Sequence, residues 1–340
     1  MSPQLQHQRG VAVITALLLT TLAITIVASL FWQQQVQVRS IENQRMQLQK
    51  KWVLRGAIDW ARLILREDGR VAGRVDHLGE PWAVRLADTR LDQYVENGRE
   101  DADASDATLS GQIVDAQSMF NLTNLASNGV VDPREVDAFG RLLLSLHIDT
   151  QLADSAASMI ASSQIKVKKS TDGTSGVTPA GTTSPATPEK DGGSKSTAES
   201  SATEVQFPGF VQVDDLLAVS GFTPEIVATL RKFVTVLPRR TPININTTSA
   251  EVLAARIDGV SAGDAAAMIA TRDRAYFFDI AHFKQQFSDK TGSVVDQDLS
   301  VATNFFLVNG KVKMNRSALD VSALIERNGN VTSVLWIREN

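Results

Sequence analysis

The chain has 340 residues, of which 43 % are hydrophobic, and it carries a formal net charge of -4 at pH 7. This length allows about two domains, and the weak net charge provides no overall electrostatic attraction to nucleic acid or anionic lipid. The absence of cysteine excludes disulfide bonds, thiolate metal sites and cysteine nucleophiles.

The first element that the sequence predicts is a membrane-spanning helix near the N-terminus. No charged residue occurs from Val11 to Val38, and about 20 apolar residues in a helix are enough to span a bilayer core. The apolar run is longer than that of a signal peptide, and it ends in the bulky residues Phe31 and Trp32. A simple single-pass membrane anchor is the alternative that this run leaves open.

The helical pattern continues beyond the apolar run. Apolar residues recur among polar ones at roughly helical spacing, at Val38, Ile41, Leu48, Trp52, Ala57, Trp60, Ile64 and Leu65. No proline interrupts the pattern before Pro81. We therefore expect one unbroken helix over residues 11–67, on the order of 80 Å long. Residues 11–32 would cross the membrane, and the rest would be amphipathic.

A long helix that is half membrane-buried and half amphipathic resembles the N-terminal helix of type IV pilins and pseudopilins. The order Arg9-Gly10 followed directly by Val11 is also similar to the prepilin peptidase site of that family. The resemblance implies that a leader of residues 1–10 is removed between Gly10 and Val11. Val11 would then be the mature, methylated N-terminus.

The fifth mature position is Thr15, where most pilins carry glutamate. In the pilin family that carboxylate is thought to neutralise the N-terminal ammonium of an adjacent subunit, because an unpaired charge within a bilayer is costly. A threonine hydroxyl can instead bond to a carbonyl of its own helix. In lacking this glutamate, the chain resembles the protein K family of type II secretion minor pseudopilins. Members of that family are proposed to sit at the pseudopilus tip. The alternative is that Thr15 is one of several threonines in an ordinary anchor.

The charges that flank the span predict a different orientation from the resemblance. Arg9 precedes the span, whereas Arg39, Arg45, Lys50, Lys51 and Arg55 follow it. The positive-inside rule would place the C-terminal side in the cytoplasm. The resemblance implies instead a single-pass protein of the inner membrane with its globular part in the periplasm.

Residues 68–124 and 301–340 are predicted to form the α+β domain of a pseudopilin. Alternation predicts a strand near residues 109–115, and the following stretch Phe120–Asn124 is similar to a Phe-Asn-Leu-Asn element of the protein K family. Thr123 departs from that element, since asparagine is expected there.

An acidic stretch within this region contains Asp101, Asp103 and Asp106, which are weak candidates for calcium ligands. Oxygen ligands at every second residue begin a calcium loop, but the glycine and bidentate glutamate of an EF-hand are missing. A solvated loop is the alternative reading. The resemblance implies that calcium can bind, since pseudopilins of this type can bind it, and no other cofactor is expected.

The region 125–300 is predicted to be a large inserted all-helical domain. Asp132 and Pro133 form an N-cap and first-turn pair for one of its helices. Residues 166–205 are rich in Ser, Thr, Gly and Pro, a composition that buries too little apolar surface to order the chain. We expect a disordered loop there.

The second half of the inserted region contains an apparent repeat of two helices joined by a short turn. The turns are predicted at residues 220–223 and 258–261, and residues 246–249 would cap the helix that contains Glu251. The pattern resembles the tandem helix-hairpin-helix, or SAM-like, units of the protein K inserted domain. Such units bind DNA in competence and repair proteins, but Glu225 and Asp264 follow the turns here and would repel a phosphate.

The C-terminal region is predicted to form about three antiparallel strands. The Asn-Gly pairs at residues 309–310 and 328–329 are strong hairpin signals, and the last strand would include residues 334–337. A sheet this small needs a packing partner, and the amphipathic half of the first helix is available. The fold class expected is α+β: a pilin-like long helix packed on a small antiparallel sheet, with the helical domain inserted.

The function implied by the resemblance is that of a non-enzymatic minor pseudopilin at the tip of the type II secretion pseudopilus. It would prime assembly for the export of folded proteins from the periplasm. Its implied partners are the minor pseudopilins I, J and H, the major pseudopilin G, prepilin peptidase, inner-membrane lipid and the inner-membrane assembly platform. The histidines belong to no catalytic motif. The alternative function is a membrane-anchored, competence-like helix-hairpin-helix protein that binds DNA, although the sequence does not favour nucleic acid as a partner.

Overall fold

A computed structural model describes residues 9–71, 75–90, 107–164, 209–292, 294–314 and 317–339. The chain divides into two compact units. The first unit contains residues 1–73, 79–114 and 306–340, and the second contains residues 74–78 and 115–305.

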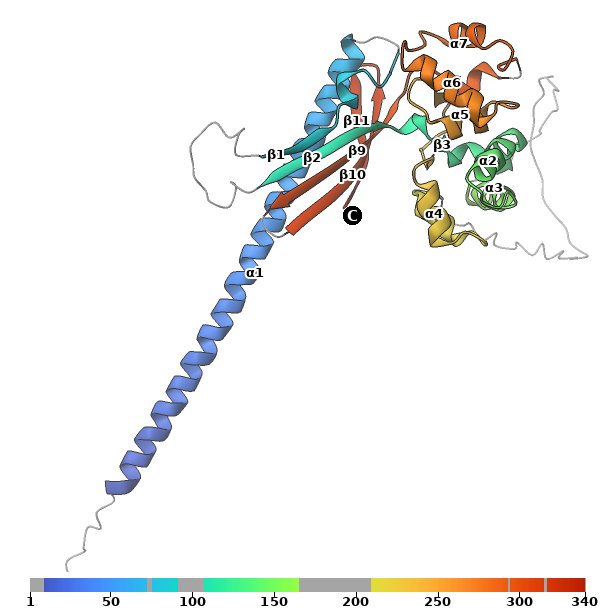
Figure 1. Ribbon diagram of the computed structural model, residues 1–340. Coiled ribbons are helices and arrows are strands. Elements are labelled where there is room, and N and C mark those ends of the chain that lie inside the picture. Colours follow the sequence, from blue (N-terminus) through green and yellow to red (C-terminus); the bar gives the residue numbers. More distant parts are fainter. Residues whose placement is uncertain are drawn as a thin grey trace, which may run out of the picture. The chain divides into compact units, whose positions relative to one another are not determined.

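The first unit is organised by one helix, α1 (Arg9–Val71), which has 63 residues (Figure 1). At 1.5 Å per residue its length is about 95 Å. The prediction of a long unbroken N-terminal helix is confirmed, and the helix begins two residues before and ends four residues after the range 11–67.

Five strands form the sheet of this unit in the order β1-β2-β9-β10-β11 (Figure 1). They are β1 (Leu86–Arg90), β2 (Thr108–Asp115), β9 (Phe305–Met314), β10 (Ser317–Asn328) and β11 (Val331–Glu339). The pairs β1/β2 and β10/β11 are antiparallel. A short 3-10 helix, η1 (Pro81–Ala83), precedes β1.

One of the two predicted Asn-Gly turns is correct and the other is wrong. Asn328 pairs with Val331 around a two-residue turn that begins with Gly329, whose φ is +58°. Asn309 and Gly310 lie within β9 instead of in a turn. A Cβ on Gly310 would come within 3.3 Å of Leu54 Cδ2 on α1, so close packing against the helix accounts for this glycine.

The core of the first unit lies between α1 and the sheet. Leu54, Ile58, Ala61 and Leu65 of α1 recur at spacings of three and four residues and are all buried. They pack against buried residues of β9 and β10, which include Phe306, Val308, Val312, Val321 and Ile325. The sheet therefore rests on the amphipathic half of α1, as predicted.

The second unit is mainly helical. Its α-helices are α2 (Pro133–Ser145), α3 (Leu152–Ser163), α4 (Pro224–Leu230), α5 (Ala250–Arg256), α6 (Ala262–Arg272) and α7 (Ile280–Gln286). Its 3-10 helices are η3 (Ala116–Ser118), η4 (Leu122–Leu125), η5 (Val213–Ala218) and η6 (Asp296–Asp298).

The expectation of an all-helical inserted domain is wrong in detail, because short strands pair within it. They are β3 (Phe120–Asn121), β4 (Ala126–Ser127), β5 (Val130–Val131), β6 (Val234–Thr235), β7 (Ile243–Asn244) and β8 (Leu299–Ser300). The pairs β3/β6 and β7/β8 are parallel, and β4/β5 is antiparallel. These bridges satisfy backbone groups of the buried segments between helices.

The helix starts follow the predicted caps. The Asp132 side chain accepts a hydrogen bond from the Arg134 amide at the start of α2. The Ser249 hydroxyl accepts one from the Val252 amide at the start of α5.

The boundaries of the second unit differ from the predicted 125–300. Phe120 belongs to the buried cluster of α2, α3 and α4, and its strand pairs with Val234 and Thr235. Residues 115–124 therefore fold with the helical unit instead of the pseudopilin sheet, and the unit extends to Phe305. The predicted loop 166–205 lies outside the described residues.

Candidate membrane and assembly site

The predicted processing residues lie at the start of α1. Gly10 and Val11 belong to its first turn, and Thr15 follows Val11 by four residues. The three predicted residues are thus brought together on the first two turns of one helix.

The N-terminal part of α1 has the length and composition of a membrane span. Its most apolar stretch of 18 residues has a mean hydropathy of 2.4 and is fully exposed. Exposed apolar surface costs about 25 cal/mol per Å² in water, so a helix of this kind requires lipid or a partner. Composition and exposure together are those of a membrane anchor.

The threonine hydroxyls of this segment donate hydrogen bonds to backbone carbonyls of the same helix. Thr15 Oγ1 donates to the Ala12 carbonyl at 3.0 Å, as the sequence predicted. Thr20, Thr21 and Thr25 donate in the same way to carbonyls three or four residues earlier, at 2.8–3.1 Å. A bilayer core offers no water as a hydrogen-bond partner. These internal bonds therefore allow the polar threonine hydroxyls to lie in an apolar helix at little cost.

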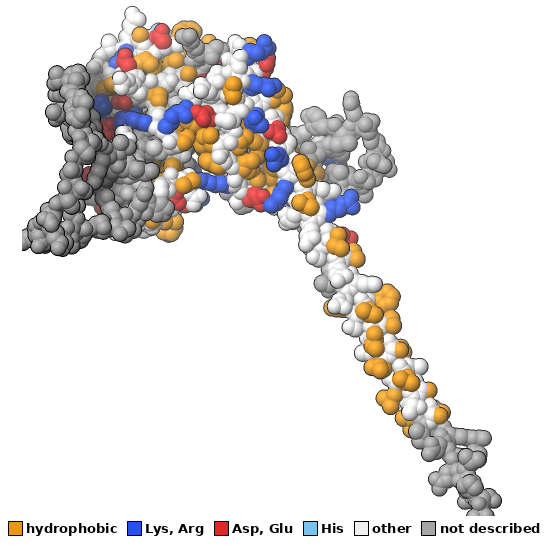
Figure 2. All heavy atoms as spheres, turned by 180° about the vertical axis from the view of Figure 1, so that it is seen from behind, with side chains coloured by type: hydrophobic (Ala, Val, Ile, Leu, Met, Phe, Trp, Pro, Cys, Tyr) orange, Lys and Arg blue, Asp and Glu red, His pale blue; other side chains and the backbone are white. Residues whose placement is uncertain are grey.

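Beyond the span, α1 continues to expose apolar side chains. They are Val38, Ile41, Leu48, Trp52, Trp60 and Leu63, and we call them the exposed apolar row. Their spacings of three, four, seven or eight residues place them toward one side of the helix. Figure 2 shows apolar side chains along the exposed length of α1.

Beside this row the first unit has an apolar groove of about 250 Å³. Ala57, Trp60 and Ile64 of α1 line one wall, and residues from η1 to β2 line the other. The sequence reasoning identified the helix periodicity but not this groove, because its second wall comes from a distant part of the chain.

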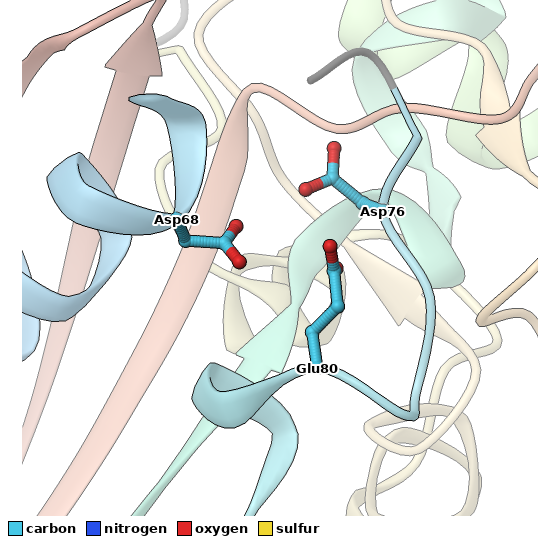
Figure 3. A group of neighbouring side chains, drawn as sticks. All are labelled: Asp68, Asp76 and Glu80. Atoms are coloured by element: carbon cyan, nitrogen blue, oxygen red, sulfur yellow. The ribbon is translucent and has the colours of Figure 1, made fainter. Parts of the chain in front are cut away.

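Two buried carboxylates of the first unit accept hydrogen bonds from side chains of its core. Figure 3 shows Asp68 of α1 and Glu80, whose carboxylate oxygens lie within 4.8 Å of one another. Asp68 accepts a hydrogen bond from Arg327 at 2.6 Å, and Glu80 accepts one from the Trp82 indole at 2.7 Å. Asp76, also labelled there, belongs to the second unit, in which its carboxylate accepts from the Thr303 amide at 2.7 Å.

The second unit contains a buried polar network that the sequence reasoning did not identify. Asp115 accepts hydrogen bonds from the Gln117 amide, the Asn244 side chain and the Thr247 hydroxyl, at 2.6–2.9 Å. Burial raises the pKa of the Asp115 carboxyl to about 6, although these hydrogen bonds act in the opposite direction.

Buried asparagines hold the irregular segments of this unit. The Asn121 side chain donates to the Arg239 carbonyl and accepts from the Leu237 amide. The Asn124 side chain donates to the Thr241 carbonyl and accepts from the Thr241 amide. The paired asparagines in FNLTNL and ININ are the signal that could have identified this network. The Phe-Asn element similar to that of the protein K family is therefore structural here.

The predicted calcium candidates Asp101, Asp103 and Asp106 lie outside the described residues.

Comparison with known proteins agrees with the fold. Sequence profiles of the family described as "Type II secretion system (T2SS), protein K" match residues 118–239 and 243–302, and together they cover more than half of the chain. The type II secretion system protein K of Pseudomonas aeruginosa (strain PAO1) is 28 % identical over 327 residues, which cover 93 % of this chain and 88 % of that protein.

A solved structure is similar over most of the chain. It is the crystal structure of the GspK–GspI–GspJ complex from the type 2 secretion system of enterotoxigenic Escherichia coli. The match covers 88 % of this chain and 98 % of the other, with 21 % identity and a TM-score of 0.61. At this identity the likeness concerns the fold. The matching profiles, together with the long apolar helix and the sheet packed on it, show that the chain belongs to the protein K family of the type II secretion system.

Proposed function

We propose that the protein acts as a minor pseudopilin at the tip of the type II secretion pseudopilus, where it primes assembly for the export of folded proteins. The observation that carries the proposal is the continuity of α1, which runs without a break from an apolar, exposed start to the core of a folded unit. One element thus serves as anchor and as scaffold. The family is a structural component of a secretion system, and we infer that the protein acts by binding instead of catalysis.

The partners that we propose first are minor pseudopilins I and J. A similar chain has been crystallised in a GspK–GspI–GspJ complex. The exposed apolar row of α1 supports the same kind of association, because apolar side chains bundle helices within and next to a membrane. Minor pseudopilin H, major pseudopilin G and the inner-membrane assembly platform follow from the family resemblance.

We propose that prepilin peptidase removes the leader between Gly10 and Val11, and that Val11 is then methylated. Thr15 would replace the usual glutamate because a tip subunit has no neighbour above it whose ammonium needs a counter-charge. The internally bonded hydroxyl of Thr15 supports this role, since the residue needs no partner in the bilayer.

We propose a single span of the inner membrane with both folded units in the periplasm. The basic residues that follow the span favour the opposite orientation, so a direct test is needed. The chain has no cysteine, and a single Ser333→Cys substitution at an exposed position of β11 provides a unique label. Labelling by a membrane-impermeant maleimide in intact spheroplasts is the expected result, and protection until lysis would contradict the orientation.

We also propose that the second unit is an insertion that contains two helix-hairpin-helix units. The supporting arrangements are η5 and α4 around residues 219–223, and α5 and α6 around residues 257–261. The turn of each includes a glycine with positive φ, Gly221 and Gly259. A unit of this bulk would fit the end of a filament better than its shaft.

DNA binding is not favoured by these turns. A helix-hairpin-helix unit binds phosphate through free amide groups at the start of its second helix. Here Thr223 accepts from the Ile226 amide, and Ser261 and Asp264 form a reciprocal capping box. Hydrogen bonds from Ser261 also lower the pKa of Asp264, which keeps its carboxylate ionised where a phosphate would bind. A mobility shift with the full chain at physiological salt would overturn this assignment.

The experiment that tests the proposed function combines N-terminal mass and complex formation. The mature chain is expected to begin at methylated Val11, and a bulky substitution at Gly10 is expected to retain the leader. The mature chain should co-purify from membranes with minor pseudopilins I and J. A chain that keeps its leader, or that purifies without both partners, would contradict the proposal.

A further inference from the structure

The apolar groove of the first unit has small residues among the larger apolar side chains that line it. Ala57 contributes only a methyl group from α1, and Gly111 and Gly310 contribute no side chain from β2 and β9. Trp60 and Val84, which is 72 % exposed, stand at its rim. The volume of about 250 Å³ is larger than the roughly 150 Å³ that accommodates a benzene ring in a protein. It therefore has room for apolar side chains of another molecule.

The charge at the groove identifies a complementary group. Arg85 lines the groove and also the polar notch next to it, which includes Lys311. Lys311 forms an ion pair with Asp320 at 3.1 Å. For Arg85, by contrast, no hydrogen bond or ion pair is found within the part of the chain that the structure describes. An occupant with a carboxylate at this position would satisfy the guanidinium.

The position of the groove determines the shape of the occupant. The groove alone has room for only a few side chains, whereas a stable interface buries about 1,000 Å² of surface in total. Trp60 belongs both to the groove and to the exposed apolar row, which extends along α1 toward the span at Val38. From Val38 to Trp60 this row is about 33 Å long. A partner that covers the row and reaches the groove is therefore elongated and runs along α1 from the membrane.

We propose that the groove receives the amphipathic helix of a neighbouring membrane-anchored pseudopilin, with apolar side chains in the groove and a carboxylate on Arg85. An amphipathic helix in an apolar groove is a common mode of recognition, read by anchors three or four residues apart. The inference rests on the proposed function, because it takes the neighbour to be a subunit of the same assembly. It adds the surface and the chemistry by which that neighbour is recognised.

Substitutions at the groove test the proposal in the full-length chain, co-purified in detergent with minor pseudopilins I and J. Ala57→Trp fills the groove, and Val84→Asp places a carboxylate at an exposed rim position that the fold does not need. Each should weaken complex formation by about tenfold or more. Ser333→Trp, an equally bulky change on exposed β11, is the matched control and should leave the affinity unchanged.

The role of Arg85 is tested by charge and salt. Arg85→Glu should weaken the complex several-fold at low ionic strength, and the difference should shrink in about 1 M salt because exposed ion pairs are screened. Arg274→Glu, an exposed arginine of the second unit, is the control. Equal affinity of wild type and Arg85→Glu at low salt would overturn the ion pair.

A photo-crosslinking residue at position 84 identifies the occupant directly. The expected adduct joins position 84 to the N-terminal helix of a minor pseudopilin. An adduct to a second copy of this chain, or to the globular part of a partner, would overturn the proposal. If the wild-type chain forms no complex with I and J, the proposed function itself fails. If it forms the complex and Ala57→Trp and Val84→Asp bind equally well, the groove proposal alone fails.

Discussion

The carboxyl group of Asp115 lies buried at the start of the second unit, next to Gln117, Asn244 and Thr247. Its pKa rises from an ordinary value of 3.8 to about 6, since the loss of hydration outweighs the hydrogen bonds that it accepts. In the unfolded chain the group ionises at its ordinary pKa. Between pH 3.8 and about 6 the folded state therefore binds more protons than the unfolded state.

The sign of the pH effect follows from this difference. The stabilisation is complete below the unfolded pKa of 3.8 and is lost as the pH rises through about 6. The rise of the Asp115 pKa from 3.8 to about 6 corresponds to about 3 kcal/mol of folding free energy, because a shift of one pKa unit is worth about 1.4 kcal/mol. Between pH 4.5 and 7.5 we expect about 2 kcal/mol of it to be lost.

Asp115→Asn provides the comparison that isolates this group. The amide does not titrate, so the contributions of other carboxyl groups cancel when the free energies of unfolding of wild type and variant are subtracted. The difference, wild type minus variant, should fall by about 2 kcal/mol from pH 4.5 to pH 7.5.

The assay must report on the second unit. All five tryptophans, Trp32, Trp52, Trp60, Trp82 and Trp336, belong to the first unit, so fluorescence would follow the wrong transition. Urea unfolding read by a short deuterium pulse on peptides that span residues 243–256 follows the correct one. A difference that rises with pH would refute the reasoning, because the hydrogen bonds to the carboxylate would then outweigh its desolvation.

Three further predictions concern packing, charge and backbone. Leu65→Ala removes a fully buried side chain between α1 and the sheet and should cost about 2–5 kcal/mol, whereas Leu63→Ala, at a half-exposed position of the same helix, should change stability by less than about 0.5 kcal/mol. Both are read by tryptophan fluorescence in urea, and equal effects would contradict the packing of the sheet on α1. Glu135→Ala removes the carboxylate that pairs with Arg240 and buried Arg256, and Arg256 is left with the more distant carboxylate of Asp298 at 3.9 Å. The change should cost about 3–5 kcal/mol, measured by hydrogen exchange in α2. A neutral result would mean that the pair is dispensable. Gly56→Ala should raise stability by up to about 1 kcal/mol, because its Cβ meets nothing within 4 Å in a helix. Gly111→Ala should lower the stability, because the added Cβ would lie 2.8 Å from the Asn309 carbonyl oxygen. Differential scanning calorimetry compares the two glycine variants, and the opposite order of stability would contradict this account.

The features that the sequence determined by itself depend on neighbours a few residues apart. The uncharged run after Val11 and the apolar periodicity beyond it were sufficient to predict α1 as one helix. They did not predict its buried face, because Trp52 and Trp60 of the predicted row are exposed, whereas Leu54, Ile58 and Ala61 are buried. The caps Asp132 and Ser249 were equally readable, since a capping side chain bonds an amide only two or three residues ahead. The hydroxyl bond of Thr15 belongs to the same class.

The tertiary structure decided the features that depend on residues distant in the chain. Asn309-Gly310 has the same letters as Asn328-Gly329, yet it lies within β9, because the fold brings Leu54 of α1 against Gly310. Residues 115–124 were predicted with the sheet, but Phe120 packs among helices more than ten residues away. The groove and the raised pKa of Asp115 could not be predicted for the same physical reason: a cavity and a desolvated carboxyl group exist only when remote segments exclude water together.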